Sequence, residues 1–82
     1  MTPGTAAEIL GLGPSSMSRY LTSGRLKAAK YGREWNINPN DLHEFFTQDW
    51  APGADWRAFL NYRLEEVKSQ TAKSAIQAFL AA

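Results

Sequence analysis

Basic side chains crowd into one part of this 82-residue chain, and such a cluster is suited to binding anions. Residues 15–33 contain no acid, whereas the rest of the chain holds all 8 Asp and Glu residues, and the formal net charge is only +1. A cationic tract set apart from the acids creates a local field that attracts an anionic partner. The alternative is a solvated surface loop, and charge alone does not decide between them. The cations are Arg19, Arg25, Lys27, Lys30 and Arg33.

The sequence carries no pattern typical of catalysis or metal binding. His43 is the single histidine, Asp41 and Glu44 do not share its helical face, and the chain has no cysteine for a zinc site. Ser16 or Ser18 as a nucleophile would need a base at motif spacing, and the sequence offers none. We therefore predict a binding protein that is not an enzyme and uses no cofactor.

A short helix is expected to precede the cationic tract. Thr2 is a suitable N-cap with Pro3 at the first helical position, and Gly11 is suited to end the helix. Thr5 with Glu8 offers a second capping box. The predicted helix has about two turns.

A second short helix carries the first cation of the tract. Pro14 begins it and Gly24 ends it, while Met17, Tyr20 and Leu21 fall on one apolar face. The two helices meet through a tight turn at residues 11–13. This arrangement is a helix-turn-helix.

The remaining cations fall on a predicted β-hairpin made of residues 26–32 and 33–38. Gly32 supplies the positive φ of its turn, and Trp35 and Ile37 alternate with polar residues. Because Ile37 shares its face, we interpret Trp35 as a core residue and not as a platform for base stacking. A third helix, capped by Asn38 or Asn40, is expected over residues 41–50.

The C-terminal part of the chain is predicted to be one amphipathic helix. Residues 51–55 break the pattern, and Asp55 is a suitable N-cap for a helix over 56–82. The expected organisation is therefore a domain at 1–48, a linker at 49–55 and this helix. Its apolar stripe either folds back on the domain or pairs with a second copy. We favour self-association, because a short domain has little surface to cover so long a stripe.

Residues 1–46 resemble the excisionase-type winged helix-turn-helix domain, a close relative of the DNA-binding domain of MerR regulators. The predicted fold is therefore mainly α with a small β-hairpin. Pro14, Thr22, Ser23 and Glu34 depart from the family pattern, and these departures remove positive charge. The residues that match the pattern are Thr2, Ala6, Ala7, Leu10, Gly24, Leu26, Gly32, Arg33, Trp35, Ile37, Asp41 and Leu42.

The resemblance implies double-stranded DNA as the partner and two groups of contact residues. In the recognition helix, which would enter the major groove, these are Ser15, Ser16, Ser18, Arg19 and Thr22. In the wing, which would contact phosphates or the minor groove, they are Lys27, Lys30, Tyr31, Gly32 and Arg33. Arg25 either reaches the DNA backbone or is simple surface, and the sequence leaves both readings open.

The family favours a phage or mobile-element excisionase that shapes attachment-site DNA for an integrase. Two other DNA-binding roles are open: a small MerR-like transcriptional regulator and the DNA-recognition domain of a phage terminase small subunit. An alternative of another class is a protein-interaction adaptor that does not bind DNA. The lack of cysteine, signal peptide and membrane-spanning run favours the cytoplasm.

Overall fold

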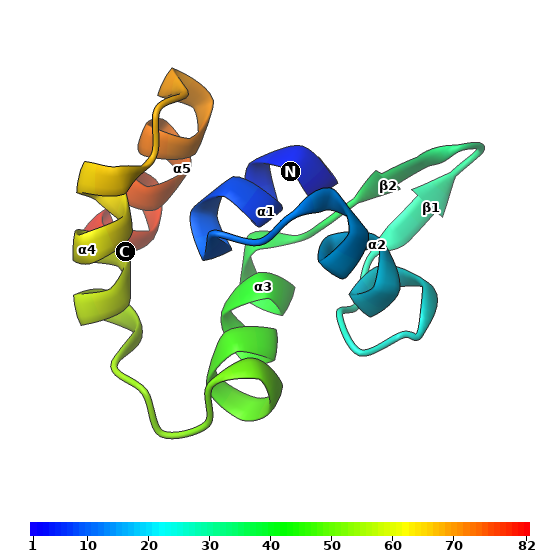
Figure 1. Ribbon diagram of the computed structural model, residues 1–82, viewed down its shortest axis with the longest axis horizontal. Helices are drawn as coiled ribbons and strands as arrows, with labels where there is room; N and C mark the ends of the chain where they lie inside the picture. The colour runs from blue at the N-terminus through cyan, green and yellow to red at the C-terminus, as the bar shows by residue number, and fades with distance from the viewer.

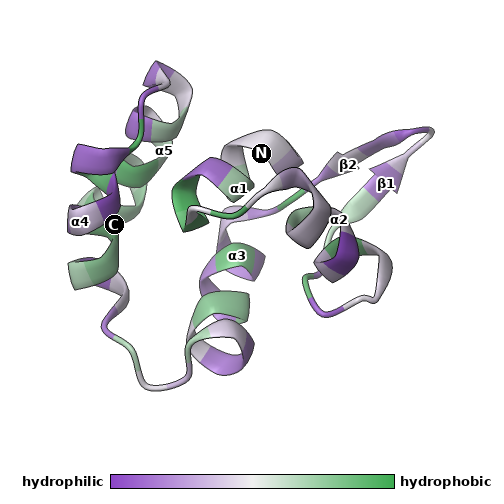
Figure 2. Ribbon diagram, in the orientation of Figure 1, coloured by the Kyte–Doolittle hydropathy of each residue, from purple (hydrophilic) through white to green (hydrophobic).

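In the computed structural model, which describes residues 1–82, the first helix lies between a β-hairpin and two C-terminal helices (Figure 1). This is the mainly helical winged helix-turn-helix that the sequence predicts. Figure 2 shows the apolar end of the first helix turned toward the C-terminal helices, whereas the hairpin is mainly hydrophilic. In chain order the elements are α1 (Pro3–Leu10), α2 (Pro14–Thr22), β1 (Ala29–Tyr31), β2 (Glu34–Asn36), α3 (Pro39–Phe45), a π-helical turn η1 (Phe46–Trp50), α4 (Trp56–Glu66) and α5 (Gln70–Ala81).

Both predicted ends of α1 are confirmed. The Thr2 hydroxyl accepts the N–H of Thr5 at 3.2 Å, and Gly11 adopts the left-handed conformation with φ 74°. Such a C-terminal residue is usually glycine, because a Cβ is strained there. The second capping box is wrong, because the Glu8 carboxylate accepts backbone N–H groups of the C-terminal segment instead.

The hairpin forms the wing, and its turn includes Gly32 with φ 64°. Each strand has only three residues and is shorter than predicted. Beyond β2, the N–H of Ile37 donates to the Met1 carbonyl at 2.8 Å. This bond anchors the base of the wing beside the start of α1, and the Ile37 side chain is fully buried.

α3 begins at the predicted cap, where the Asn38 side chain accepts the N–H of Asn40 at 2.9 Å. Its continuation η1 brings Phe46 into the centre of an aromatic cluster. The Phe46 ring lies 4.7 Å from both Trp56 and Phe59, between ring centroids. Offset and tilted aromatic pairs at this spacing stabilise packing beyond the apolar area they bury. The cluster thus joins α3 to the C-terminal helices.

The prediction of one helix over 56–82 is wrong, because the segment forms a hairpin of two helices. Asp55 caps α4 as predicted, but Val67 is extended and ends it, and the Ser69 hydroxyl caps α5. The freed N–H groups of Lys68 and Ser69 both donate to the Glu8 carboxylate, at 3.1 and 2.9 Å. The N–H groups freed at the break are therefore satisfied by an acceptor on α1. The periodicity of the segment does not reveal such a distant partner.

One hydrophobic cluster runs through the winged part and the C-terminal hairpin. It includes Ile9 and Leu10 of α1 together with Leu60, Val67 and Ile76 of the hairpin. Much of the stripe that led us to favour self-association thus packs within a single chain, while Leu64, Phe79 and Leu80 stay partly exposed. Folding back over α1, which the sequence left open, is the arrangement observed.

Candidate nucleic-acid interface

α2 has one face packed on α1 and one face open to solvent. Met17 and Leu21 are buried, and Pro14 follows an uncapped Gly13 at the helix start. Four of the five residues predicted for this helix to contact DNA are exposed, and Ser16 is half-buried. The exposed ones are Ser15, Ser18, Arg19 and Thr22.

Two of these side chains differ in whether they form hydrogen bonds within the chain. The Thr22 hydroxyl donates to the carbonyl of Ser18 at 3.0 Å, so its proton is used within the helix and its oxygen remains an acceptor. The Arg19 side chain makes no hydrogen bond or ion pair within the chain. Its guanidinium is therefore available to an acceptor outside the chain.

The register of the wing sorts its side chains onto two faces. Lys30 pairs with Trp35 across the strands, and Tyr31 pairs with Glu34. Because successive residues of a strand point to opposite faces, Lys30 and Trp35 share one face and the other pair shares the second. The Lys30 ammonium lies 5.0 Å from the centroid of the Trp35 ring, and Tyr31 is 69% exposed.

Arg25 is the one cation of the tract that has an acidic partner. Its guanidinium binds the Asp49 carboxylate through two hydrogen bonds, of 3.1 and 2.6 Å, and lies 4.7 Å from the Tyr20 ring centroid. The hydrogen bond from Arg25 holds the pKa of Asp49 below its ordinary value, and the same bond raises the pKa of Arg25. The Arg25 charge is therefore compensated within the chain, and the choice between its two readings stays a prediction.

The other four cations of the tract have no acidic partner within the chain, because the Arg25–Asp49 pair is the only ion pair. All four are exposed, three of them in or beside the wing and one on α2. Unpaired cations keep their full attraction for an anionic partner. They are Arg19, Lys27, Lys30 and Arg33.

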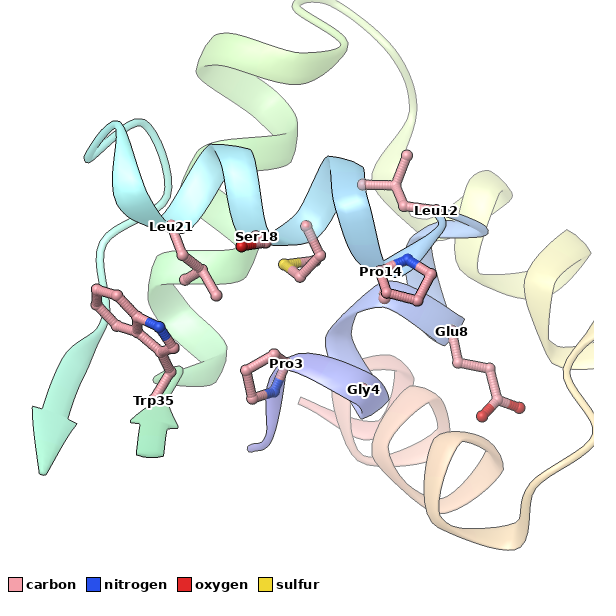
Figure 3. Close-up of a pocket in the computed structure, with 10 residues that line it drawn as sticks. Pro3, Gly4, Glu8, Leu12, Pro14, Ser18, Leu21 and Trp35 are labelled. Atoms are coloured by element: carbon pink, nitrogen blue, oxygen red, sulfur yellow. The ribbon is translucent and has the colours of Figure 1, made fainter. Parts of the chain in front are cut away.

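A groove of about 390 Å³ runs between α1 and α2, and Trp35 is the residue of the wing that lines it. Figure 3 shows Trp35 at one end, with Ser18 and Leu21 of α2 nearby, and Glu8 at the other end. Trp35 packs against the hydrophobic cluster but stays half-buried. The sequence placed it in the core and missed that part of its surface faces the groove.

The single histidine lies beside the aromatic cluster that joins α3 to α4. His43 lies against Trp56, with 5.5 Å between ring centroids, and is far from the predicted contact serines in sequence. No group of three or more His, Cys, Asp or Glu side chains is placed to hold a metal ion. None of the helices has the length and apolarity that crossing a membrane requires.

The comparison with protein families agrees with this geometry. The family described as "Helix-turn-helix domain" matches residues 1–49, which is more than half of the chain and includes α1, α2, the wing and α3. No curated protein matches the chain, and no solved structure matches it either.

Proposed function

Because the chain belongs to the helix-turn-helix family of small excisionase-like and MerR-like DNA-binding domains, we propose that it recognises a specific sequence in double-stranded DNA without catalysing a reaction. The observation that carries the proposal is the placement of the unpaired cations. Arg19 lies on the exposed face of α2, and Lys30 and Arg33 lie on the neighbouring wing. A recognition helix flanked by a wing is an arrangement in which both elements can contact one duplex, and these cations would then face its phosphates and bases.

In the proposed complex, α2 lies in the major groove. Its outer face would contact base edges and flanking phosphates through Ser15, Ser16, Ser18, Arg19 and Thr22. Short serine side chains let the helix backbone approach closely, and the guanidinium of Arg19 can donate two hydrogen bonds to a guanine edge. This helix would supply the sequence preference.

The wing would supply affinity through the DNA backbone. Lys27, Lys30 and Arg33 each neutralise a phosphate, while Tyr31 and Gly32 approach the adjacent minor groove at the tip. Arg25 is not included, because Asp49 already neutralises its charge. Three phosphate contacts predict that log K falls with log[salt] with a slope of about −3.

Among DNA-binding roles we favour that of an excisionase, which organises attachment-site DNA for an integrase in the cytoplasm. Such a role requires binding and bending but no reaction centre, in keeping with the residues present. The packaging alternative rested on a helical tail free to oligomerise, and in this chain the tail is docked on α1. We therefore do not carry that alternative forward.

A salt titration tests whether the chain binds DNA at all. Fluorescence anisotropy with a labelled random duplex at low salt should give measurable affinity, and a duplex selected in vitro should bind more tightly. The adaptor alternative predicts no affinity for DNA even at low salt.

For the excisionase role, gel mobility of the selected site placed at different positions in a fragment measures the bend, and an unbent complex would contradict that role.

A further inference from the structure

We propose that Trp35 is a contact to the DNA backbone, and that its indole N–H and the Lys30 ammonium bind one phosphate between α2 and the wing. This inference rests on the proposed function, since it requires that the protein bind DNA. Neither sequence spacing nor the family match assigns Trp35 this role.

Trp35 is placed where a duplex lying along α2 would pass. It extends from β2 into the groove and lies beside Ser18 and Leu21 of α2 (Figure 3). Ser18 is exposed on the helix face proposed to contact DNA, so a strand that reaches Ser18 also passes Trp35. Glu8, the acidic residue of the groove, lies at its other end and is held there by Lys68 and Ser69.

The indole N–H is free to donate. Trp35 makes no hydrogen bond through its side chain, and the structure contains no buried side-chain nitrogen or oxygen that lacks a partner. The nitrogen is therefore accessible to solvent and to an incoming acceptor. The ring itself is packed against the hydrophobic cluster. A donor held in place in this way loses little conformational freedom on binding.

Lys30 brings a positive charge over the face of the same ring. Its ammonium lies 5.0 Å from the Trp35 ring centroid, and the strand register fixes the two side chains as cross-strand neighbours. No acidic side chain pairs with Lys30. A neutral N–H donor beside a cation matches a phosphate, which offers several oxygens and a negative charge.

The opposite face of the wing is less suited to a phosphate. There Tyr31 pairs with Glu34, whose carboxylate would repel the DNA backbone. The wing is thus asymmetric in charge, and the Lys30 face is the one that adjoins the groove. This asymmetry selects Trp35 over Tyr31 as the aromatic residue that meets a phosphate.

The test replaces Trp35 by phenylalanine, which keeps an aromatic ring but removes the N–H. Trp35→Phe should bind the selected duplex about tenfold more weakly than the wild-type chain. Its salt slope should be unchanged, because a neutral donor releases no counterion. Trp50→Phe is the matched control. It makes the same change in the aromatic cluster near Phe46 and should leave DNA affinity unaltered.

Lys30→Met provides the complementary variant. It should weaken binding and also reduce the magnitude of the salt slope by about 0.9. If both groups hold one phosphate, the losses of Trp35→Phe and Lys30→Met should not be additive in the double variant. Additive losses would show that the two side chains do not share a ligand.

A measurement on the wild-type chain does not depend on how well a variant folds. The chain has 3 tryptophans, so its NMR spectrum contains three indole N–H signals, which the Phe variants assign. On addition of the selected duplex the Trp35 signal should shift, whereas those of Trp50 and Trp56 should stay. A Trp35 signal that stays fixed, or unchanged affinity in Trp35→Phe, would overturn this inference while the proposed function stands. A wild-type chain that binds no DNA would overturn the proposed function itself.

Discussion

Glu8 and Arg63 join α1 to the C-terminal hairpin from both sides. The Arg63 guanidinium donates to the carbonyls of Glu8 and Ile9 at 2.9 and 3.0 Å. The Glu8 carboxylate in turn accepts the N–H groups that lead into α5. A side chain of α4 thus satisfies carbonyls at the end of α1, and a side chain of α1 satisfies the N–H groups that lead into α5, as helix ends require.

The first prediction concerns pH and Glu8. The Ser69 backbone N–H, together with the Ser69 side chain, holds the pKa of Glu8 below its ordinary value of 4.5. A carboxyl group with a lowered folded-state pKa stabilises the fold above pH 4.5, and this contribution is lost as pH falls through the folded pKa. Glu8→Gln should therefore lower the melting temperature at pH 7 and reduce the difference between pH 7 and pH 3. Thermal unfolding followed by circular dichroism measures both.

Glu44→Gln is the control for Glu8, since Glu44 is exposed and makes no side-chain hydrogen bond or ion pair in the chain. Its melting temperature should follow that of the wild-type chain from pH 7 to pH 3. A Glu8→Gln profile that also follows the wild type would mean that the bonds to Lys68 and Ser69 do not contribute to stability.

The second prediction concerns the core of the C-terminal hairpin of α4 and α5. Ile76 is fully buried in the cluster shared with α1. Ile76→Ala should therefore destabilise the whole chain by about 2–5 kcal/mol, whereas exposed Gln77→Ala should have little effect. Denaturant unfolding followed by tryptophan fluorescence and by circular dichroism should give one coincident transition. Separate transitions for the two probes would show that the winged part folds independently of the hairpin.

The third prediction is that the free protein sediments as a monomer of 9.1 kDa at micromolar concentration. The physical reason is that much of the apolar stripe of residues 56–82 is covered by α1 and η1 within one chain. Analytical ultracentrifugation measures the mass. A mass of two chains would contradict this prediction and would support self-association instead.

The fourth prediction separates Arg25 from the other cations. Because Asp49 neutralises Arg25, Arg25→Ala should leave the salt slope of DNA binding unchanged, whereas Arg33→Ala should reduce its magnitude by about 0.9. Asp49→Asn should raise affinity at low salt, because it frees the Arg25 charge. Anisotropy titrations at several salt concentrations compare the three variants. A slope that falls equally for both arginines would mean that Arg25 leaves Asp49 to bind phosphate.

The fifth prediction distinguishes base contact from backbone contact. Arg19→Ala should cost about 1–3 kcal/mol of affinity for the selected duplex and much less for random duplex. Arg33→Ala should weaken binding to both duplexes to a similar extent. Competition titrations with the two duplexes give this ratio. An equal loss on both duplexes for Arg19→Ala would remove Arg19 from sequence recognition.

The order of the elements in the winged part could be predicted because their signals are local. Thr2, Pro3 and Gly11 bracket α1, Asn38 caps α3 and Asp55 caps α4, each within a few residues of the helix it limits. The exposure of Arg19 could also be predicted, because it lies off the apolar face of a short helix.

What could not be predicted depends on partners distant in sequence. The break at Val67 contains no proline or glycine, and its N–H groups are satisfied by Glu8, about 60 residues earlier. Asp49 lies 24 residues from Arg25 with no periodic relation to it. For Trp35, strand alternation gave the correct apolar face. It did not reveal that this face ends at a groove, which exists only once α1 and α2 are in place.

Both α2 and the C-terminal hairpin of α4 and α5 pack on α1, each against a different part of it. A chimera that contains only residues 1–48 would lack the helices that cover this part of α1. The Ile9 and Leu10 side chains would then be exposed to solvent. Grafts intended to test the proposed DNA binding should therefore move the entire chain, and substitutions meant to leave the packing intact are best confined to the exposed residues of α2.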